Sequence, residues 1–231
     1  PEIARRLALG ITQPGSFVAH VGISTAVQSS SLENPLAQAS LSQALATASE
    51  ETVAECASRL SEAPFAIWVG FGARKAAASI RELAERTGAA VMCSPRGKGI
   101  FPENHLQFVG VTGFAGHESV LQYMQEQPPL RTLVLGSRLG EFTSFWNSAL
   151  VPTGGFIHVD IDPKVPGTAY PDAETFAIQS DVGAFVRGLL KYFPEHPEHL
   201  SKIDLPRPEC KVITPKIEGL IRPDVLMNAI Q

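Results

Sequence analysis

Short apolar runs alternate with longer amphipathic segments through the middle of the chain. Each run is apolar at consecutive positions, which is typical of strands that are buried on both faces of a parallel sheet. The segments between the runs repeat apolar residues at helical spacing and predict covering helices. We therefore predict an α/β fold with a doubly wound, mostly parallel sheet of the Rossmann type. The predicted strands cover residues 65–70, 89–93, 132–136, 156–161 and 175–179, and the predicted helices cover 73–87, 116–126 and 181–193.

The sequence before these strands predicts a helix, a linker and a small piece that cannot build a core alone. Thr47 and Glu50 have the spacing of a capping box and predict a helix that runs to about Leu60. Further upstream lie a short predicted helix over residues 1–12 and the β-prone segment SFVAHVGIS. A polar, Ser-rich stretch that is typical of a linker separates them from the capping box.

The sequence after the last predicted helix is rich in proline and charge. Beyond Phe193 it predicts an extended linker that wraps the surface, and Pro223 predicts the first turn of a final helix. The chain therefore divides into three predicted parts, with one complete domain in the middle. Their bounds are 1–46, 47–193 and 194–231.

The amino-acid composition and charge argue against several classes of function. The 231-residue chain has a net charge of −4, and its basic residues are scattered rather than clustered, which argues against a nucleic-acid partner. No apolar run approaches the roughly 18 residues of a membrane span. The three cysteines have no paired spacing, which favours a reducing, cytoplasmic setting. We also expect no metal site, because His196 and His199 have the spacing of zinc ligands but no nearby cysteine partner.

A glycine-rich turn follows the first predicted strand and raises the question of a dinucleotide. Gly70 and Gly72 match the start of the G-x-G-x-x-G motif, but the third position is Lys75. The second strand ends in Met92-Cys93-Ser94, without the carboxylate that would bind the ribose of NAD. An NAD-dependent oxidoreductase domain therefore remains only an alternative.

Small and polar residues follow several other strands. Because ligands bind beyond the carboxyl ends of the strands in open α/β sheets, these positions are expected to face one crevice. They are Gly136-Ser137-Arg138, Asp160-Ile161-Asp162, Ser180-Asp181, and Gly113 within a run of glycines spaced by three.

These motifs together resemble a known family. The segments VGFGAR, RGKGIFPENH, GVTGFAG, VLGSRL and HVDIDP, followed by SD before a helix, resemble the central domain of thiamine diphosphate-dependent enzymes. The enzymes that it resembles are of the acetolactate synthase, pyruvate oxidase and oxalyl-CoA decarboxylase type. The resemblance covers about residues 47–193. Residues 1–46 resemble the end of the family's pyrimidine-binding domain plus a linker, and 194–231 resemble a linker and the start of its diphosphate-binding domain.

The resemblance implies a six-stranded, mostly parallel fold that is Rossmann-like, of the DHS-like NAD/FAD-binding type. Some members hold FAD or ADP there and others hold nothing. If the family's site is carried over by position, the pyrophosphate would lie at the loop after the first strand. The loop that begins at Gly136 would line the middle of the cleft, and the residues after the last two strands would lie near the ribose and adenine. Gly113 would lie near the distal end of a flavin. The implied cofactor-binding residues are Gly70, Gly72, Ala73, Arg74, Gly113, Gly136, Ser137, Arg138, Asp160, Ile161 and Asp181. Phe71 departs from the small residues of many flavin-binding members, and its ring could block the pyrophosphate or point into the core.

For the parent protein, the resemblance implies carbon–carbon chemistry on a 2-oxo acid or related acyl donor, with thiamine diphosphate and Mg²⁺. The family's activating glutamate lies in the first domain and its metal-binding Gly-Asp-Gly motif in the third, so this segment alone is expected to be inert. The implied partners are those two domains, in a homodimer or homotetramer. The domain itself is then a scaffold with an empty nucleotide site or a functional FAD- or ADP-binding module.

Three polar features also have structural interpretations. Asp160 could contact a ribose or cap the following turn, and Arg138 could meet an anion or form an ion pair. Arg96 and Lys98 could grip a phosphate or lie in a solvated loop whose glycines allow tight turns.

Overall fold

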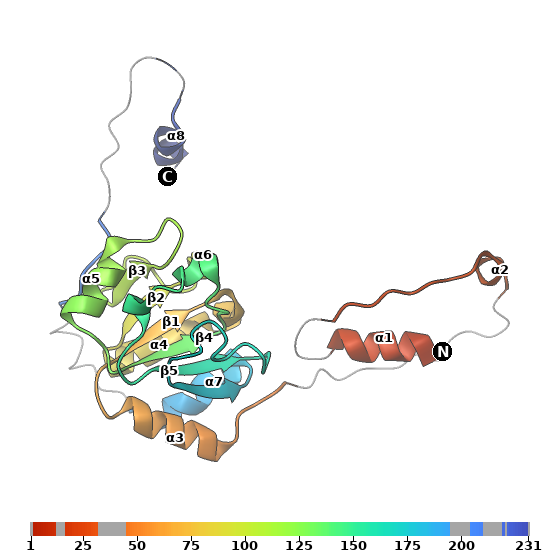
Figure 1. Cartoon of the computed structure of the whole chain (residues 1–231), viewed down its shortest axis with the longest axis horizontal. Helices are drawn as coiled ribbons and strands as arrows, with labels where there is room; N and C mark the ends of the chain where they lie inside the picture. Colours follow the sequence, from red (N-terminus) through yellow and green to blue (C-terminus); the bar gives the residue numbers. More distant parts are fainter. Residues whose placement is uncertain are drawn as a thin grey trace.

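A six-stranded sheet with all neighbouring strands parallel forms the centre of the computed structural model (Figure 1). The structure describes residues 2–12, 17–31, 45–194, 204–209, 219 and 221–230. The strand order is β3-β2-β1-β4-β5-β6, so the chain winds outward from β1 in one direction and then from β4 in the other. This confirms the predicted doubly wound α/β fold. The strands are β1 (Phe65–Val69), β2 (Ala90–Cys93), β3 (Phe108–Val111), β4 (Arg131–Leu135), β5 (Phe156–Asp160) and β6 (Thr175–Gln179).

Continuous burial explains why the inner strands read as unbroken apolar runs. All five residues of β1 are buried, as are all five of β5. In the register of the sheet, Ile67 lies between Val91 of β2 and Leu133 of β4, so branched side chains line up across three strands. Side chains of this kind pack well on a pleated surface that is covered on both sides.

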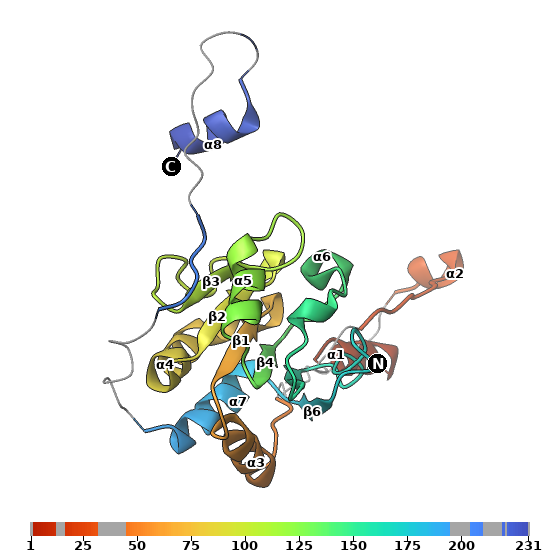
Figure 2. The ribbon, with the colours of Figure 1, turned by 60° about the vertical axis from the view of Figure 1, so that its left-hand side comes forward.

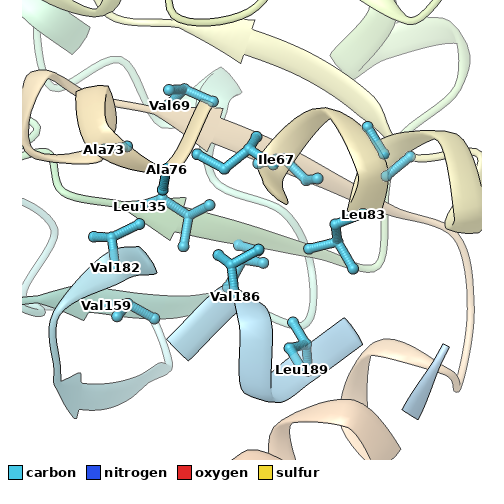
Figure 3. Packing of buried hydrophobic residues seen from close by; sticks show 14 of the residues in the cluster. Ile67, Val69, Ala73, Ala76, Leu83, Leu135, Val159, Val182, Val186 and Leu189 are labelled. Carbon is cyan, nitrogen blue, oxygen red and sulfur yellow. The ribbon is translucent and has the colours of Figure 1, made fainter. Parts of the chain in front are cut away.

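Helices cover both faces of the sheet and form two separate cores. One face packs against α3 (Glu50–Leu60), α4 (Ala77–Thr87) and α7 (Val182–Leu189), as Figure 3 shows for Ile67, Leu83 and Val186. The other face packs against α5 (Glu118–Glu126) and the short η3 (Ser148–Leu150). Figure 2 shows α5 and α7 on opposite sides of the strands.

Several element ends differ from the sequence prediction. The capping box at Thr47 was wrong, because Ser49 is the N-cap of α3 and its side chain accepts from the Thr52 amide. The helix predicted from residue 73 begins instead as the 3₁₀ turn η1 (Phe71–Ala76) and becomes α-helical only at Ala77. Strand β3 has no counterpart among the apolar runs, and only the family resemblance implied a sixth strand.

The described parts of the flanking segments contain three helices and an extended piece that lies on the domain. Helices α1 (Glu2–Thr12) and α8 (Pro223–Ile230) match the predicted terminal helices, and α2 (Thr25–Gln28) was not predicted. The described residues 17–24 form no strand, contrary to the β-prone reading. Residues 204–209 lie on the domain, where Gln127 donates to the Asp204 carbonyl (2.8 Å) and Arg207 donates to that of Asn104 (3.0 Å). The described part of the chain has no helix that is both long and apolar enough to cross a bilayer.

Candidate functional site

The expected crevice lies where the winding direction reverses, between the carboxyl ends of β1 and β4. Hydrogen-bonded pairing places Val69 beside Leu135, so the loops that begin at Gly70 and Gly136 leave the sheet next to each other. In open α/β sheets this position is the usual ligand site. The sequence prediction therefore selected the two loops that the fold brings together.

The two loops fill this crevice by packing against each other. A Cβ atom on Gly70 would collide with the Gly136 carbonyl oxygen and the Ser137 Cβ. A Cβ atom on Gly136 would lie 2.7 Å from the Gly72 Cα, and Gly136 itself has a φ of +61°, which favours glycine. The glycines thus serve a close backbone contact between loops.

The amide groups that would hold a pyrophosphate already have acceptors inside the protein. Gly70 donates to the Leu135 carbonyl and Gly72 to the Gly136 carbonyl, each at 2.9 Å. Ala73 donates to the Gly70 carbonyl at 3.0 Å, and its side chain lies in the core beside Val182 and Leu135 (Figure 3). Phosphate loops bind through amides that point at the ligand, so these three amides are not available in this arrangement.

Phe71 points outward and not into the core. Its side chain is 42% exposed, and the guanidinium carbons of Arg74 and Arg96 lie 4.4 and 4.6 Å from the ring centroid. Arg74 also donates to the Phe71 carbonyl at 3.3 Å. Both arginines are held by a cation–π contact at the rim of the sheet, and within the described residues neither has a carboxylate within ion-pair distance.

A buried histidine fixes the loop after β4. His158 of β5 donates from Nε2 to the Ser137 carbonyl at 2.8 Å. Burial lowers the pKa of His158, while the Ser137 bond and the nearby Asp160 oppose that shift. The ring is therefore neutral at pH 7 and carries its proton on Nε2, which sets the tautomer. The sequence shows His158 only as one more strand residue, so no sequence signal marked this role.

The carboxylates at the ends of β5 and β6 have local partners. Asp160 accepts from the Asp162 amide at 2.9 Å, which is the turn-capping alternative, and Asp162 lies 4.0 Å from Arg138, which is the ion-pair alternative. Asp181 accepts from the Ala184 amide at 2.8 Å and is the N-cap of α7. The Ile161 carbonyl accepts from Gln179 at 3.4 Å.

Gly113 lies apart from these residues, beside a small hollow. The hollow has a volume of about 170 Å³ and lies between the loop after β3 and α6 (Glu141–Ser144). His117 lines it and accepts from the Val111 amide through Nδ1 at 2.9 Å. Burial lowers the pKa of His117 and is the largest cause of that shift. The predicted set thus divides into a packed centre, an outer β5–β6 group, and Gly113.

The described residues contain no group of three His, Cys, Asp or Glu side chains placed to hold a metal ion. His196 and His199 lie outside the described residues, as does Cys210. Burial raises the pKa of the Cys56 thiol and of the Cys93 thiol to about 12, so neither forms a thiolate near neutral pH.

A family model described as "Thiamine pyrophosphate enzyme, central domain" matches residues 53–189, which is more than half of the chain. The chain belongs to this family. The sheet and its two loops therefore correspond to the central domain of the thiamine pyrophosphate enzymes.

Relatives with the same domain include acetolactate synthases. The chain is 33% identical over 103 residues to acetolactate synthase of Mycobacterium avium, covering 44% of this chain and 16% of that protein. It is 29% identical over 163 residues to the acetolactate synthase isozyme 1 large subunit of Escherichia coli K12, covering 69% of this chain and 28% of that one. The matched regions therefore span between 16% and 28% of the length of these relatives.

The solved structure of benzoylformate decarboxylase from Polynucleobacter necessarius has the same fold. Its TM-score is 0.63 at 19% identity, over 85% of this chain and 36% of that one. At this identity the likeness concerns the fold alone. It confirms the architecture expected for a thiamine pyrophosphate enzyme central domain.

Proposed function

We propose that this chain is the central domain of a larger thiamine diphosphate-dependent enzyme that acts on a 2-oxo acid or related acyl donor. In this proposal residues 47–193 are the domain, and they form a scaffold between a preceding pyrimidine-binding domain and a following diphosphate-binding domain. The parent is a cytoplasmic homodimer or homotetramer. The family membership and the order of the motifs support this assignment.

Thiamine diphosphate, bound with Mg²⁺ in the parent, would supply the carbon nucleophile for the carbon–carbon chemistry. The described residues of this chain present no cluster of His, Cys, Asp and Glu side chains that would hold that Mg²⁺. We assign the chain no catalytic step. With thiamine diphosphate, Mg²⁺ and pyruvate the isolated chain is expected to give no turnover, and measurable decarboxylation would contradict the assignment.

The observation that carries the scaffold role is the packing of the Gly70 and Gly136 loops. The amides of Gly70, Gly72 and Ala73 are used inside the protein, and a pyrophosphate would have to separate two backbones in contact. Separating them breaks hydrogen bonds worth about 1 kcal/mol each before any ligand contact forms. In this proposal the crevice between the two loops therefore binds no nucleotide.

One observation favours the alternative, an FAD- or ADP-binding module. Arg74 and Arg96 flank the exposed ring of Phe71 at the same edge of the sheet, where guanidinium groups suit phosphate oxygens. In that case the nucleotide would bind on the rim, over Arg74, Arg138 and Asp160, and not within the packed loops.

Thermal unfolding with ligand distinguishes the two. A nucleotide with a Kd of about 10 μM, added at about 1 mM, stabilises the folded state by about 2.7 kcal/mol. For a domain of this size that raises the melting temperature by roughly 5 to 10 °C. We expect no rise with FAD, ADP or NAD. A rise with FAD or ADP that is lost in Arg74→Gln and kept in Arg187→Gln would establish the alternative.

A further inference from the structure

A hollow lies at the amino edge of the sheet, at the opposite end of the strands from the crevice between Gly70 and Gly136. It has a volume of about 570 Å³ and is bordered by the first residue of β1, the start of β2, the end of α5 and residues 204–205. Cavities of roughly 300 to 1,000 Å³ are typical binding sites for small organic molecules. We call this space the amino-edge hollow.

Small residues on one side and a fixed segment on the other explain why the hollow exists. Gly88 follows α4 with a φ of +72°, which favours glycine, and Ala90 at the start of β2 contributes only a methyl group. On the outer side, the bond from Gln127 to the Asp204 carbonyl holds the wall beside α5, and the next residue, Leu205, packs against the core. The walls on both sides are therefore in place without a ligand.

Tyr123 of α5 lines the hollow with a hydroxyl that lacks a partner. Its side chain is only 4% exposed, and among the described residues its hydroxyl has no hydrogen-bond partner. Burial raises the pKa of Tyr123, so the hydroxyl stays protonated at neutral pH and can donate. By contrast, the buried Tyr170 donates to the Asn147 carbonyl at 3.3 Å. Buried polar groups in proteins normally have partners, so the Tyr123 hydroxyl requires one from outside the described residues.

Gln127 places a second polar group beside the Tyr123 hydroxyl. The two residues are four positions apart at the end of α5, where the Gln127 amide donates to the Tyr123 carbonyl at 2.9 Å, so their side chains are neighbours on one side of the helix. The Gln127 Nε2 already donates to Asp204, which leaves its Oε1 as an acceptor. The hollow therefore offers one O–H donor next to one carbonyl acceptor.

The rest of the lining is largely apolar. It consists of proline, aromatic and aliphatic side chains, namely Pro64, Phe65, Ala90, Pro128 and Leu205. Among the described residues that line the hollow, only the exposed Asp204 carries a charge. A buried charge costs far more free energy than a buried amide, and a carboxylate ligand would also meet Asp204. The lining therefore favours a neutral molecule.

A neighbouring hollow shows how unusual the free hydroxyl is. It lies on the other side of Phe65 and has a volume of about 450 Å³. The hydroxyls that line it belong to Ser61 and Thr87, and each donates to a helix carbonyl at 2.8 Å. The two spaces thus differ in that only the amino-edge hollow contains, among its described lining residues, a hydroxyl without a partner.

We propose that the amino-edge hollow is a binding site for a small neutral amide with an aromatic ring. The ligand carbonyl would accept from the Tyr123 hydroxyl, and the ligand N–H would donate to the Gln127 Oε1. The ring would pack against Phe65 and the two prolines, as aromatic rings do in apolar sites. A bound molecule would also contact Leu205 and so hold residues 204–209 more firmly on the domain. The hollow shares no residue with the crevice, so the inference is independent of the proposed function.

Fluorine NMR of the 231-residue chain labelled with 3-fluorotyrosine tests the site. The chain has three tyrosines, Tyr123, Tyr170 and Tyr192, so we expect three resonances, each assigned by replacing that tyrosine with phenylalanine. The probe is benzamide, whose small size leads us to expect a Kd of roughly 1 to 10 mM. Benzamide should move the Tyr123 resonance in a saturable way and leave the other two in place. Benzoate, which has the same ring and a charged carboxylate, should move none of them.

Tyr123→Phe and Tyr170→Phe form a matched pair of variants. Tyr123→Phe should weaken benzamide binding, measured by saturation-transfer NMR, roughly threefold to tenfold, because one hydrogen bond is lost. Tyr170→Phe should leave the Kd unchanged. Without ligand, Tyr170→Phe loses its bond to Asn147 and should lower the melting temperature by about 2 to 4 °C, whereas Tyr123→Phe should not lower it.

Three results would each overturn the proposal. The first is a Tyr123 resonance that does not move up to about 50 mM benzamide, several times the expected Kd, as is expected if water or another part of the chain occupies the hollow. The second is equal movement of all three resonances, which indicates non-specific binding. The third is an equal loss of melting temperature in Tyr123→Phe and Tyr170→Phe, because the Tyr123 hydroxyl would then have a partner within the protein. None of these results would affect the proposed function.

Discussion

Replacing Gly70 by alanine tests the contact that fills the crevice. The backbone of Gly70 has a φ of −105° and a ψ of 174°, which alanine adopts without strain. Any effect of Gly70→Ala therefore comes from the added methyl group and not from the backbone conformation. That methyl group would collide with the Gly136 carbonyl oxygen and the Ser137 Cβ, so the two loops must move apart.

The expected loss of stability is about 3 kcal/mol. Inserting one methyl group into a packed site costs roughly 1 to 3 kcal/mol. Moving the loops also weakens the bonds from Gly70 to Leu135 and from Gly72 to Gly136, each worth about 1 kcal/mol. For a domain of this size, 3 kcal/mol lowers the melting temperature by roughly 6 to 12 °C.

Urea unfolding followed by circular dichroism measures this loss, and Gly140→Ala is the matched control. Gly140 lies in the same loop as Gly136, with a φ of −67°, and a Cβ atom there would meet nothing within 4 Å. We expect the control to lose less than about 1 kcal/mol, the cost of alanine at a helix N-cap. If Gly70→Ala lost no more than Gly140→Ala, the loops would not be in tight contact. A pyrophosphate could then enter between them, and the scaffold argument would fail.

Three further changes test individual contacts. Asp181→Ala should cost about 1 kcal/mol in urea unfolding by removing the cap of α7, whereas Asp181→Asn should stay within a few tenths. Thr112→Val leaves the buried Trp68 Nε1 without its acceptor, now at 3.1 Å, and should cost about 1 to 3 kcal/mol, whereas Thr112→Ser should retain most of the stability. Burial lowers the pKa of His158, so its neutral form stabilises the fold above the ordinary pKa of about 6.5 and that stability is lost as the pH falls further. The free energy of unfolding should therefore decrease as the pH is lowered from about 7.5 to 5.5, and it should decrease less in His158→Gln. If the variant and the unmodified protein lost stability equally over this range, His158 would not have this role.

The sheet was predictable because its inner strands are buried on both faces. Burial on two sides favours apolar residues at consecutive positions; β1 shows that pattern throughout, β4 shows it over its last three residues, and β5 shows it except at His158 and Asp160. Strand β3 was not predicted because Gly110 interrupts its apolar residues and because it follows a long loop that contains only the 3₁₀ turn η2 (Pro95–Gly97) and no α-helix. The N-cap was misplaced by two residues because Thr47 and Ser49 both have side chains that can cap a helix.

The position of the candidate site could be predicted from the sequence, but whether its backbone amides are free to bind a ligand could not. Ligand sites in doubly wound sheets follow the strand order, so the loops at Gly70 and Gly136 could be selected from sequence. The two loops are separated by more than 60 residues along the chain. Whether their amides point outward depends on how closely the loops approach each other in the folded protein. A sequence pattern does not encode that distance. The direction of Phe71 could not be predicted for the same reason, because it depends on Arg96 from another loop.

The loop after β4 closes the crevice and then turns away from it. Between β4 and η3 the chain first lies down on β1, held by the Gly72–Gly136 bond and by His158 on Ser137. It then turns through Leu139 in a left-handed conformation and rises as α6, which carries Phe142 outward. If a nucleotide occupied the crevice, the start of this loop would have to lift, and the bonds from Gly72 to Gly136 and from His158 to Ser137 would have to break. The loop is therefore held in the crevice from β1 on one side and from β5 on the other, and a scaffold with a closed crevice requires no more than these contacts.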